Sequence, residues 1–223
     1  FMPKDTYCAQ PDYNIHIEGN LKSICCVAHG KYARTGTIAE TFDAFQSIRN
    51  ALADGQQHPA CSGCWKTELS GYKSARHAYN SQHRDLGHLG QAPTVRSIQW
   101  SFSNTCNFAC RSCSLDYSTG WLNETRRLAG EGDVKANQSL QKYTKTQWDQ
   151  QEWQDIKQYL HSVDHLELFG GEPMLNTKFI PTLNSIDDSI ASGINLVLTT
   201  NGSQAPRAEL MDCLSKFKSI RIT

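Results

Sequence analysis

The sequence lacks the features that mark membrane, exported and nucleic-acid-binding proteins. It contains no run of about 18 or more apolar residues, and its N-terminus has no charged region followed by an apolar core and a small-residue cleavage site. Basic and acidic side chains balance at 22 each, so no charge excess points to nucleic acid or a membrane surface. We therefore expect a cytoplasmic protein that binds neither.

Two further features are missing. None of the eight histidines stands at metal-ligand spacing from another, and only His29, beside Cys25 and Cys26, remains a minor ligand candidate. The chain begins with Phe1 rather than methionine, and its last residues alternate like the start of a strand. We expect the natural protein to be longer.

Cysteine, by contrast, is plentiful, with nine residues in 223. Eight of them gather in a few places: Cys8, Cys25, Cys26, Cys61, Cys64, Cys106, Cys110 and Cys113. A disulfide scaffold is typical of small secreted domains, and no export signal is visible, so metal ligation is the better interpretation. The ninth, Cys213, stands alone in a helical pattern and is expected to be a small buried hydrophobe.

The first 75 residues predict a small α+β domain. Residues 13–17 and 21–26 alternate around Gly19, which predicts a hairpin. A capping box at residues 37–40 opens an amphipathic pattern that runs to Leu52, which predicts one helix. The polar stretch that follows has few apolar anchors, so we place a linker at residues 76–94.

Strand and helix patterns alternate from residue 95 onward. Strands are predicted at 98–102, 166–169, 194–199 and 219–223, helices at 115–128, 146–163 and 208–217, and a loop at 130–139. This repeated βα order predicts a parallel sheet with right-handed crossovers. A closed eight-stranded barrel needs about 250 residues, so residues 95–223 supply only part of a (β/α) barrel.

Cys106, Cys110 and Cys113 form a CxxxCxxC loop directly after the first of these strands. Three thiolates on one loop can hold three irons of a four-iron cluster, and no fourth cysteine is close in sequence. One iron is then left open. An open metal at the carboxyl end of a strand lies where α/β enzymes place ligands and chemistry, so the spacing indicates a catalytic site.

The second motif is Gly-Gly-Glu-Pro at residues 170–173, which ends the next strand. Paired glycines there let a ligand approach the backbone closely. The exposed amide and carbonyl groups can then bind a polar head group such as an amino acid's ammonium and carboxylate. An isolated match would as readily be an ordinary βα turn.

Together the two motifs resemble those of radical SAM enzymes, whose partial (β/α) barrel binds a four-iron four-sulfur cluster and S-adenosylmethionine (SAM). The resemblance implies that the three loop cysteines ligate the cluster and that SAM chelates the open iron. It also implies that Gly170, Gly171 and Glu172 contact the SAM ammonium group.

Two more features follow from the same resemblance. Thr200 and Asn201, which end the third strand, are similar to the polar strand end that faces SAM in that family. The residue before the third cysteine is commonly aromatic and near the adenine there, but here it is Ser112, which leaves Phe108 as the candidate for an apolar wall. The implied reaction is reductive cleavage of SAM to a 5′-deoxyadenosyl radical that abstracts hydrogen from a substrate, with ferredoxin or flavodoxin as electron donor.

The N-terminal cysteines resemble an auxiliary iron–sulfur domain of the SPASM/twitch type, here placed ahead of the barrel at residues 1–75. The expected ligands are Cys8, Cys61, Cys64 and either Cys25 or Cys26. Spacing alone leaves zinc and an iron–sulfur cluster equally open. Such domains often accompany peptide modification, so a peptide is the family-level expectation for the substrate.

Two other hypotheses are left open. The cysteines could serve a non-catalytic electron carrier or a metal-stabilised binding module, in which the Gly-Gly-Glu-Pro motif has no role. Alternatively, the chain is inactive by itself although its parent protein is an enzyme. Affinity for SAM distinguishes the first of these from the enzyme hypothesis.

Overall fold

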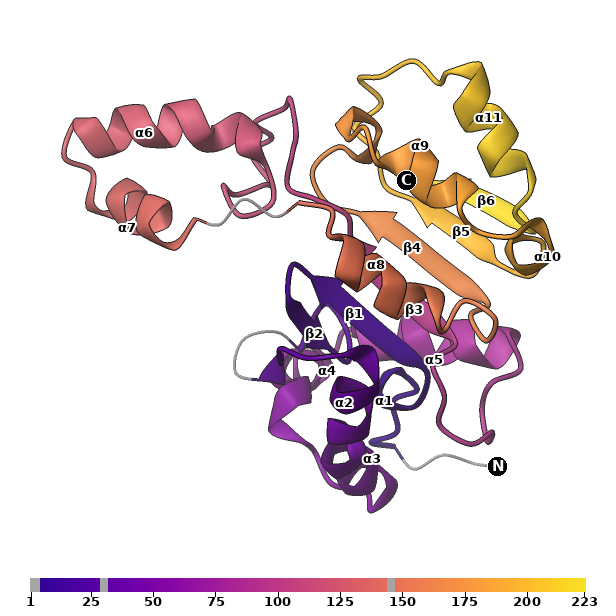
Figure 1. Cartoon of the computed structure of the whole chain (residues 1–223). Helices are drawn as coiled ribbons and strands as arrows, with labels where there is room; N and C mark the ends of the chain where they lie inside the picture. Colours follow the sequence, from indigo (N-terminus) through magenta and orange to yellow (C-terminus); the bar gives the residue numbers. More distant parts are fainter. Residues whose placement is uncertain (1–4, 29–31, 144–146) are drawn as a thin grey trace. The chain divides into compact units, whose positions relative to one another are not determined.

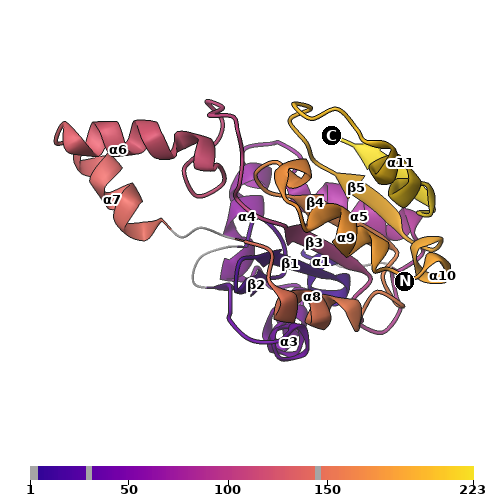
Figure 2. The same cartoon turned by 45° about the horizontal axis from the view of Figure 1, so that its top comes forward.

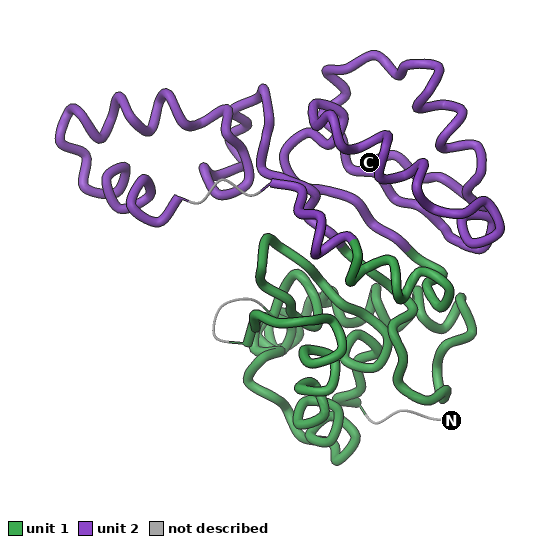
Figure 3. The backbone as a smooth tube through the Cα atoms, in the orientation of Figure 1, with its two compact units in different colours: residues 1–99, 154–165 green, residues 100–153, 166–223 purple. Residues whose placement is uncertain are grey.

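The computed structural model describes residues 5–28, 32–143 and 147–223 (Figure 1). Contacts between Cα atoms divide the chain into two compact units (Figure 3). The first contains residues 1–99 and 154–165, and the second contains residues 100–153 and 166–223. No helix within these described ranges is long and apolar enough to cross a membrane. His29, a minor ligand candidate, lies outside the described residues.

The strands follow the order β2-β1-β3-β4-β5-β6 in an open, mostly parallel sheet. Their bounds are β1 Asn14–Glu18, β2 Leu21–Ser23, β3 Ser97–Ser101, β4 His165–Phe169, β5 Asn195–Leu198 and β6 Ser219–Ile222. β1 and β2 pair antiparallel, whereas β5 and β6 pair parallel. The predicted α/β class is confirmed, and each strand predicted after residue 95 is present within two residues of its expected bounds.

The first unit begins with the short helix α1 (Gln10–Tyr13) and the hairpin β1–β2. Gly19 turns the hairpin with a φ of 59°, a conformation that glycine adopts without steric cost. Ile15 and Ile17 are fully buried, as the alternation predicts. The expected hairpin is therefore confirmed, although β2 is shorter than the alternating stretch.

The single helix expected at residues 37–52 is two helices, α2 (Ile38–Ala44) and α3 (Gln46–Ala53). Thr37 and Glu40 form the predicted capping box. At Phe45 the backbone N–H bonds to Phe42 O instead of continuing the α pattern, so the helix axis breaks there. The apolar stripe is nevertheless core: Ile38, Phe45, Ile48 and Leu52 are buried, and Phe42 is half-buried.

The expected linker at 76–94 is largely ordered structure of the first unit. After η2 (Pro59–Cys61) and α4 (Ser62–Leu69), helix α5 (Ala75–Asp85) begins, and it buries Arg76 and His83. Apolar periodicity does not reveal this helix, because it is held by polar side chains. His83 Nδ1 lies 2.8 Å from His88 Nδ1, and His88 Nε2 lies 2.7 Å from Asp164 Oδ2.

In the second unit the carboxyl ends of the strands lie at one edge. Phe102 N–H donates to Phe169 O at 2.8 Å, and Thr199 N–H donates to Leu168 O at 2.9 Å. Thr200 N–H donates to Thr223 O at 3.0 Å. The residues that follow β3, β4 and β5 therefore meet, as expected for parallel strands. The intervening elements are η4 (Pro173–Leu175), α9 (Phe179–Asn184), α10 (Asp188–Ala191) and α11 (Ala208–Ser215).

The helices between β3 and β4 differ from the prediction. η3 (Thr119–Trp121) precedes α6 (Leu122–Gly130), so the helix starts later than residue 115. The expected loop at 130–139 contains α7 (Val134–Lys142), which begins where the Asp133 side chain accepts from Ala136 N–H at 2.7 Å. Figures 1 and 2 show α6 and α7 side by side.

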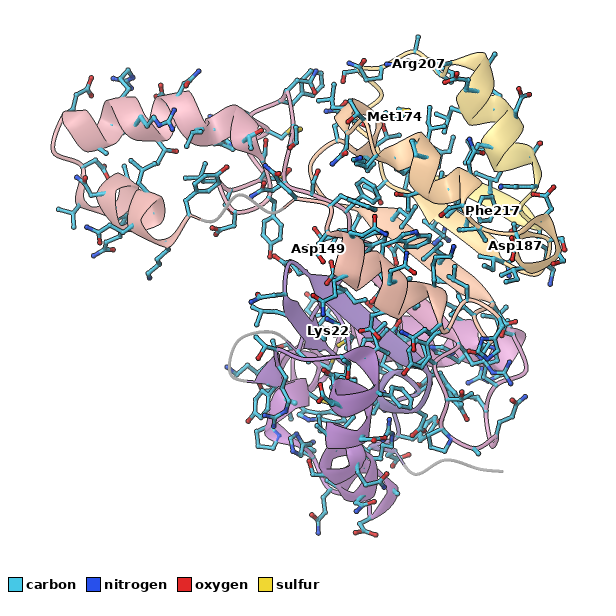
Figure 4. The ribbon with its side chains drawn as sticks, viewed as in Figure 1. Lys22, Asp149, Met174, Asp187, Arg207 and Phe217 are labelled. Carbon is cyan, nitrogen blue, oxygen red and sulfur yellow. The ribbon has the colours of Figure 1, made fainter. Side chains whose placement is uncertain are left out.

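Helix α8 (Gln150–Lys157) is shorter than the helix expected at 146–163, whose first residue lies outside the described residues. Asp149 caps it by accepting from Glu152 N–H at 2.8 Å (Figure 4). Turns continue the chain after Lys157. The predicted apolar positions are buried both in the helix, at Trp153 and Ile156, and in these turns, at Leu160 and Val163.

An aromatic core lies directly behind the carboxyl end of β3 in the second unit. Trp100 stacks on Trp153 with ring centres 5.6 Å apart, and Phe102 meets Phe179 edge to face at 5.5 Å. Trp100 Nε1 donates to Glu152 Oε2 at 3.1 Å, which satisfies its one polar group. This packing fixes the position from which the cysteine loop starts.

Candidate functional site

The CxxxCxxC loop is held through its backbone by residues just beyond it. Cys106 N–H donates to Thr119 Oγ1 at 2.9 Å, and the same hydroxyl donates back to Cys106 O at 3.0 Å. Trp121 Nε1 donates to Cys110 O at 3.1 Å. Since these bonds use main-chain groups of the loop, they do not engage the cysteine sulfurs.

Gly120 makes this arrangement possible because its lack of a side chain lets it lie close to the backbone of the cysteine loop. A Cβ at this position would lie 2.6 Å from Phe108 C and 3.1 Å from Ala109 N, inside van der Waals contact. Ser118 Oγ donates to Phe108 O at 2.5 Å on the same stretch. A larger residue at 120 must displace the cysteine loop.

The three sulfurs of the loop lie near one another at the surface. Cys106 is half-buried, while Cys110 and Cys113 are exposed. Burial raises the pKa of the Cys113 thiol, and the neighbouring thiols of Cys110 and Cys106 raise it further. Cys106 Sγ accepts from Phe108 N–H at 3.4 Å and from Asn201 Nδ2 at 3.5 Å. Donors of this kind stabilise a thiolate and tune a metal bound to it.

The two glycines after β4 allow another segment of the chain to come close to their backbone. Gly170 has a φ of +91°, and a Cβ there would lie 2.8 Å from Ser103 O. Gly171 has a φ of +56°, and a Cβ there would lie 2.8 Å from Thr105 C. From sequence, a ligand was expected to approach these glycines. In the structure, the segment leading to the cysteine loop occupies the space where their Cβ atoms would lie. Glu172 N–H donates to Thr105 O at 2.7 Å and completes this junction.

Glu172 joins the ends of β4 and β5. Its carboxylate is fully buried, and Oε2 accepts from the Thr200 hydroxyl at 2.8 Å and from Asn201 N–H at 2.6 Å. Oε1 accepts from Met174 N–H at 3.1 Å and caps η4. In the structure this side chain is a buried connector whose oxygens already have partners, whereas the sequence analysis expected it to contact a ligand's ammonium group.

Asn201 connects the third strand end to the cysteine loop. Besides Cys106 Sγ, its Nδ2 contacts Asn107 Oδ1 at 3.1 Å. Asn107 Nδ2 in turn donates to Ser203 Oγ at 3.0 Å, and Ser203 N–H donates to Asn201 Oδ1 at 2.9 Å. Hydrogen bonds therefore bring together the three segments predicted from sequence. We call this group the strand-end site: Cys106, Cys110, Cys113, Gly170, Gly171, Glu172, Thr200 and Asn201.

Phe108 is 42% exposed beside the strand-end site, so its ring is accessible, and its role as an apolar wall stays a prediction. A separate cavity of about 700 Å³ lies between α9 and α11. Met174 and Arg207 are at its edge (Figure 4), and no residue of the strand-end site lines it.

The first unit gathers a second set of cysteines. Cys8, Cys25, Cys61 and Cys64 are all buried, and we call them the four-cysteine site. Cys26, by contrast, is exposed, and its sulfur lies 3.0 Å from the Tyr79 hydroxyl. The structure therefore places Cys25, rather than Cys26, with the other three.

Electrostatic coupling shows that these four thiols share one environment. Burial raises the pKa of Cys8 well above its ordinary value, and Cys25, Cys61 and Cys64 raise it further. Burial likewise raises the pKa of Cys25 to about 12 and of Cys61 to about 12. Backbone hydrogen bonds from Val27 and Ala28 oppose the shift at Cys25. Binding of a metal to these cysteines would require their deprotonation.

Neither cysteine group has the spacing of a single-ion site. Across the described ranges, no three His, Cys, Asp or Glu side chains are placed to hold one metal ion. The donors of both groups are cysteine sulfurs, which can ligate either zinc or an iron–sulfur cluster, so the identity of the metal stays a prediction.

Sequence reasoning missed the residues that hold the cysteines in place. Thr119 and Gly120 fix the loop, and Arg76 and Asn80 bond the backbone on either side of Cys8. No motif marks Thr119 or Gly120. Arg76 comes directly after residues 1–75, which resemble an auxiliary domain, but its hydrogen-bond partners could not be identified from sequence.

Comparisons of the chain with models of protein families, with curated proteins and with solved structures give no match.

Proposed function

We propose that the chain is part of a radical SAM enzyme with an N-terminal auxiliary iron–sulfur cluster. The observation that carries the proposal is the strand-end site. There, one carboxylate, Glu172, and one amide, Asn201, connect the Gly-Gly-Glu-Pro turn to the sulfur of Cys106. An ordinary βα turn has no need of a buried carboxylate and three thiols at the same strand edge.

Cys106, Cys110 and Cys113 would hold the cluster, with the exposed side of the loop left open for SAM. When bound, the reduced cluster supplies the electron that cleaves SAM and so generates a 5′-deoxyadenosyl radical for hydrogen abstraction. Asn201 donates to Cys106 Sγ, which fixes the direction of this sulfur.

The other residues of the site orient and close it. Glu172 holds the Thr200 hydroxyl and the Asn201 backbone N–H in a fixed geometry, so that polar groups at the end of β5 are positioned before a ligand arrives. Phe108 offers an accessible ring beside the loop for the adenine. Such preorganisation lowers the entropy cost of binding.

The four-cysteine site would hold the auxiliary cluster through Cys8, Cys25, Cys61 and Cys64. Four ligands leave no open iron, so this cluster would serve electron transfer or structure rather than SAM cleavage. The substrate proposed at family level is a peptide, and the proposed electron donor is a ferredoxin or flavodoxin.

The test is anaerobic reconstitution of the chain with iron and sulfide, followed by iron counting and electron paramagnetic resonance of the reduced protein. We expect two four-iron clusters per chain, one of whose signals changes when SAM is added. Metal without a SAM-dependent signal would instead support the non-catalytic module.

A pair of variants in and just after the loop sharpens the test. Cys110→Ala should abolish SAM cleavage and the SAM-dependent signal while leaving the iron of the first unit in place. Asp116→Asn, an exposed position three residues after Cys113, should retain both. SAM cleavage that persists in Cys110→Ala would contradict the assignment.

A further inference from the structure

Helix α5 brings a buried arginine to the segment that carries Cys8. Arg76 Nη1 donates to Tyr7 O at 2.9 Å and to Asp5 O at 2.6 Å. Both acceptors lie just before Cys8 in the chain. The bonds therefore fix the approach of the one cysteine of the site that comes from the N-terminal segment.

Asn80, one turn further along α5, completes the hold on this segment. Its Nδ2 donates to Tyr7 O at 2.9 Å, and its Oδ1 accepts from Ala9 N–H at 2.8 Å. Cys8 thus stands between two backbone positions that are each bonded to α5. Asn80 does this without charge, which makes it a natural comparison for Arg76.

The guanidinium of Arg76 also reaches the segment that carries Cys64. It forms a two-pronged ion pair with Glu68, with Nε at 3.0 Å and Nη2 at 2.6 Å from the two carboxylate oxygens. Its carbon lies 4.9 Å from the centre of the Trp65 ring, and Trp65 follows Cys64 directly. The cation is therefore close to ligands from both ends of the unit's sequence.

The positive charge of Arg76 can compensate negative charge on a cluster bound at this position. Arginine keeps its positive charge at every accessible pH. Reduction of an iron–sulfur cluster adds a negative charge, and its potential depends on nearby charge and burial. Arg76 is buried, bonds the backbone next to Cys8 and lies over the ring next to Cys64, so its charge acts close to these ligands. Glu68, its ion-pair partner, carries the opposite charge.

We propose that Arg76 is a positioning and charge-compensating residue of the four-cysteine site, which fixes Cys8 and raises the reduction potential of the cluster held there. This inference rests on the proposed function, because it takes that cluster to be iron–sulfur. Glu68 sets how much of the arginine's charge the cluster experiences.

The experiment uses the full chain with Cys106, Cys110 and Cys113 replaced by alanine, so that only the cluster of the first unit is observed. Four variants are reconstituted in this background: Arg76→Gln, Arg76→Lys, Glu68→Gln and Asn80→Ala. For each, iron per chain is counted, and the reduced fraction is followed by electron paramagnetic resonance during a redox titration.

Arg76→Gln should lower the ratio of reduced to oxidised cluster at least tenfold at a fixed potential, which corresponds to about 59 mV for a one-electron couple. Arg76→Lys should recover most of the potential. Glu68→Gln should shift it the opposite way, because the arginine charge is then unopposed. Asn80→Ala should reduce iron content and leave the potential of the remaining cluster unchanged.

Opposite signs for Arg76→Gln and Glu68→Gln are the decisive result, since mere damage to the fold would move both in one direction. Equal potentials, or shifts of the same sign, would overturn the inference while the cluster itself stands. If Arg76→Gln does not fold, Arg76→Lys and Glu68→Gln still decide it. An unsubstituted background that takes up no iron would overturn the auxiliary cluster and this inference together.

Discussion

The buried carboxylate of Glu172 lies 2.6 Å from the backbone nitrogen of Asn201, so the turn after β4 and the turn after β5 are one hydrogen-bonded structure. Asn201 in turn reaches Cys106 Sγ. A change at Glu172 is therefore felt at the cysteine loop, although Glu172 touches none of its sulfurs directly. This linkage is the basis of the first prediction.

Replacing Glu172 should destabilise the protein and weaken SAM binding. In Glu172→Ala, the Asn201 N–H and the Thr200 hydroxyl, both half-buried, lose their acceptor, at a cost of about 1–3 kcal/mol. Glu172→Gln keeps one carbonyl oxygen and should lose less. Urea unfolding and calorimetric SAM titration measure both effects, with exposed Glu209→Gln as control. Unaltered SAM affinity in Glu172→Ala would show that the site does not depend on this connector.

Two glycines with the same φ allow the cost of backbone strain to be measured separately from the cost of steric overlap. Gly170 and Gly132 both have a φ of +91°, but only at Gly170 would a Cβ meet backbone, at 2.8 Å from Ser103 O. Gly132→Ala should cost about 1–2 kcal/mol through the positive φ alone. Gly170→Ala should cost a further ~1–3 kcal/mol from overpacking. Equal losses in urea unfolding would mean that the turn opens without penalty.

The two adjacent cysteines of the first unit should behave differently. Cys25 is buried with the other thiols of its site, whereas Cys26 is exposed beside Tyr79. We expect Cys25→Ser to lose the iron of the first unit and Cys26→Ser to keep it. Iron and sulfide counts after reconstitution measure this. Loss of iron in Cys26→Ser with retention in Cys25→Ser would reverse the ligand assignment.

A methyl group at Gly120 should release iron from the cysteine loop. The added Cβ would lie 2.6 Å from Phe108 C, and this backbone can move only by shifting Cys106 and Cys110. Gly120→Ala should therefore lower cluster occupancy at the loop several-fold. Gly130→Ala, whose Cβ would enter open space, is the matched control. Full occupancy in Gly120→Ala, judged by iron count and the SAM-dependent signal, would contradict this.

Sequence patterns predicted well whatever depends on apolar periodicity. The strands after residue 95 are where alternation and buried runs place them, because Leu166, Leu168 and Leu196 face a core. The parallel order of the strands also explains why the cysteine loop meets the two later strand ends, since carboxyl ends of parallel strands share an edge.

Structures held by polar groups were not predictable in this way. Helix α5 buries Arg76 and His83, so a search for apolar anchors reads it as a linker. The close approach at Gly170 can be read from sequence, but one group that approaches it, Ser103, comes from another strand end and is visible only in the structure. Choosing Cys25 over Cys26 likewise needed coordinates, because adjacent residues have the same sequence spacing to every partner.

The hydrogen bonds of His83 and His88 also indicate which of their ring nitrogens carry protons. His88 Nε2 lies 2.7 Å from Asp164 Oδ2, so we infer that it donates there. With His88 neutral, its Nδ1 accepts from His83 Nδ1–H across 2.8 Å. His83 Nε2 is then bare, and it is buried without a hydrogen-bond partner among the described residues. Protonating His83 would place a cation beside His88 and His165.

This arrangement predicts an acid-dependent loss of stability. Burial, and then the neighbouring His88 and His165, lower the pKa of His83 from 6.5 to about 3. Between these values the unfolded chain binds a proton that the folded chain does not, so the free energy of unfolding falls as pH falls, by up to about 1.4 kcal/mol per unit. Urea unfolding from pH 7 to pH 4 should show this slope, and His83→Gln should flatten it, while exposed His161→Gln controls for the substitution itself. A slope that His83→Gln leaves unchanged would assign the acid sensitivity to groups other than this buried imidazole.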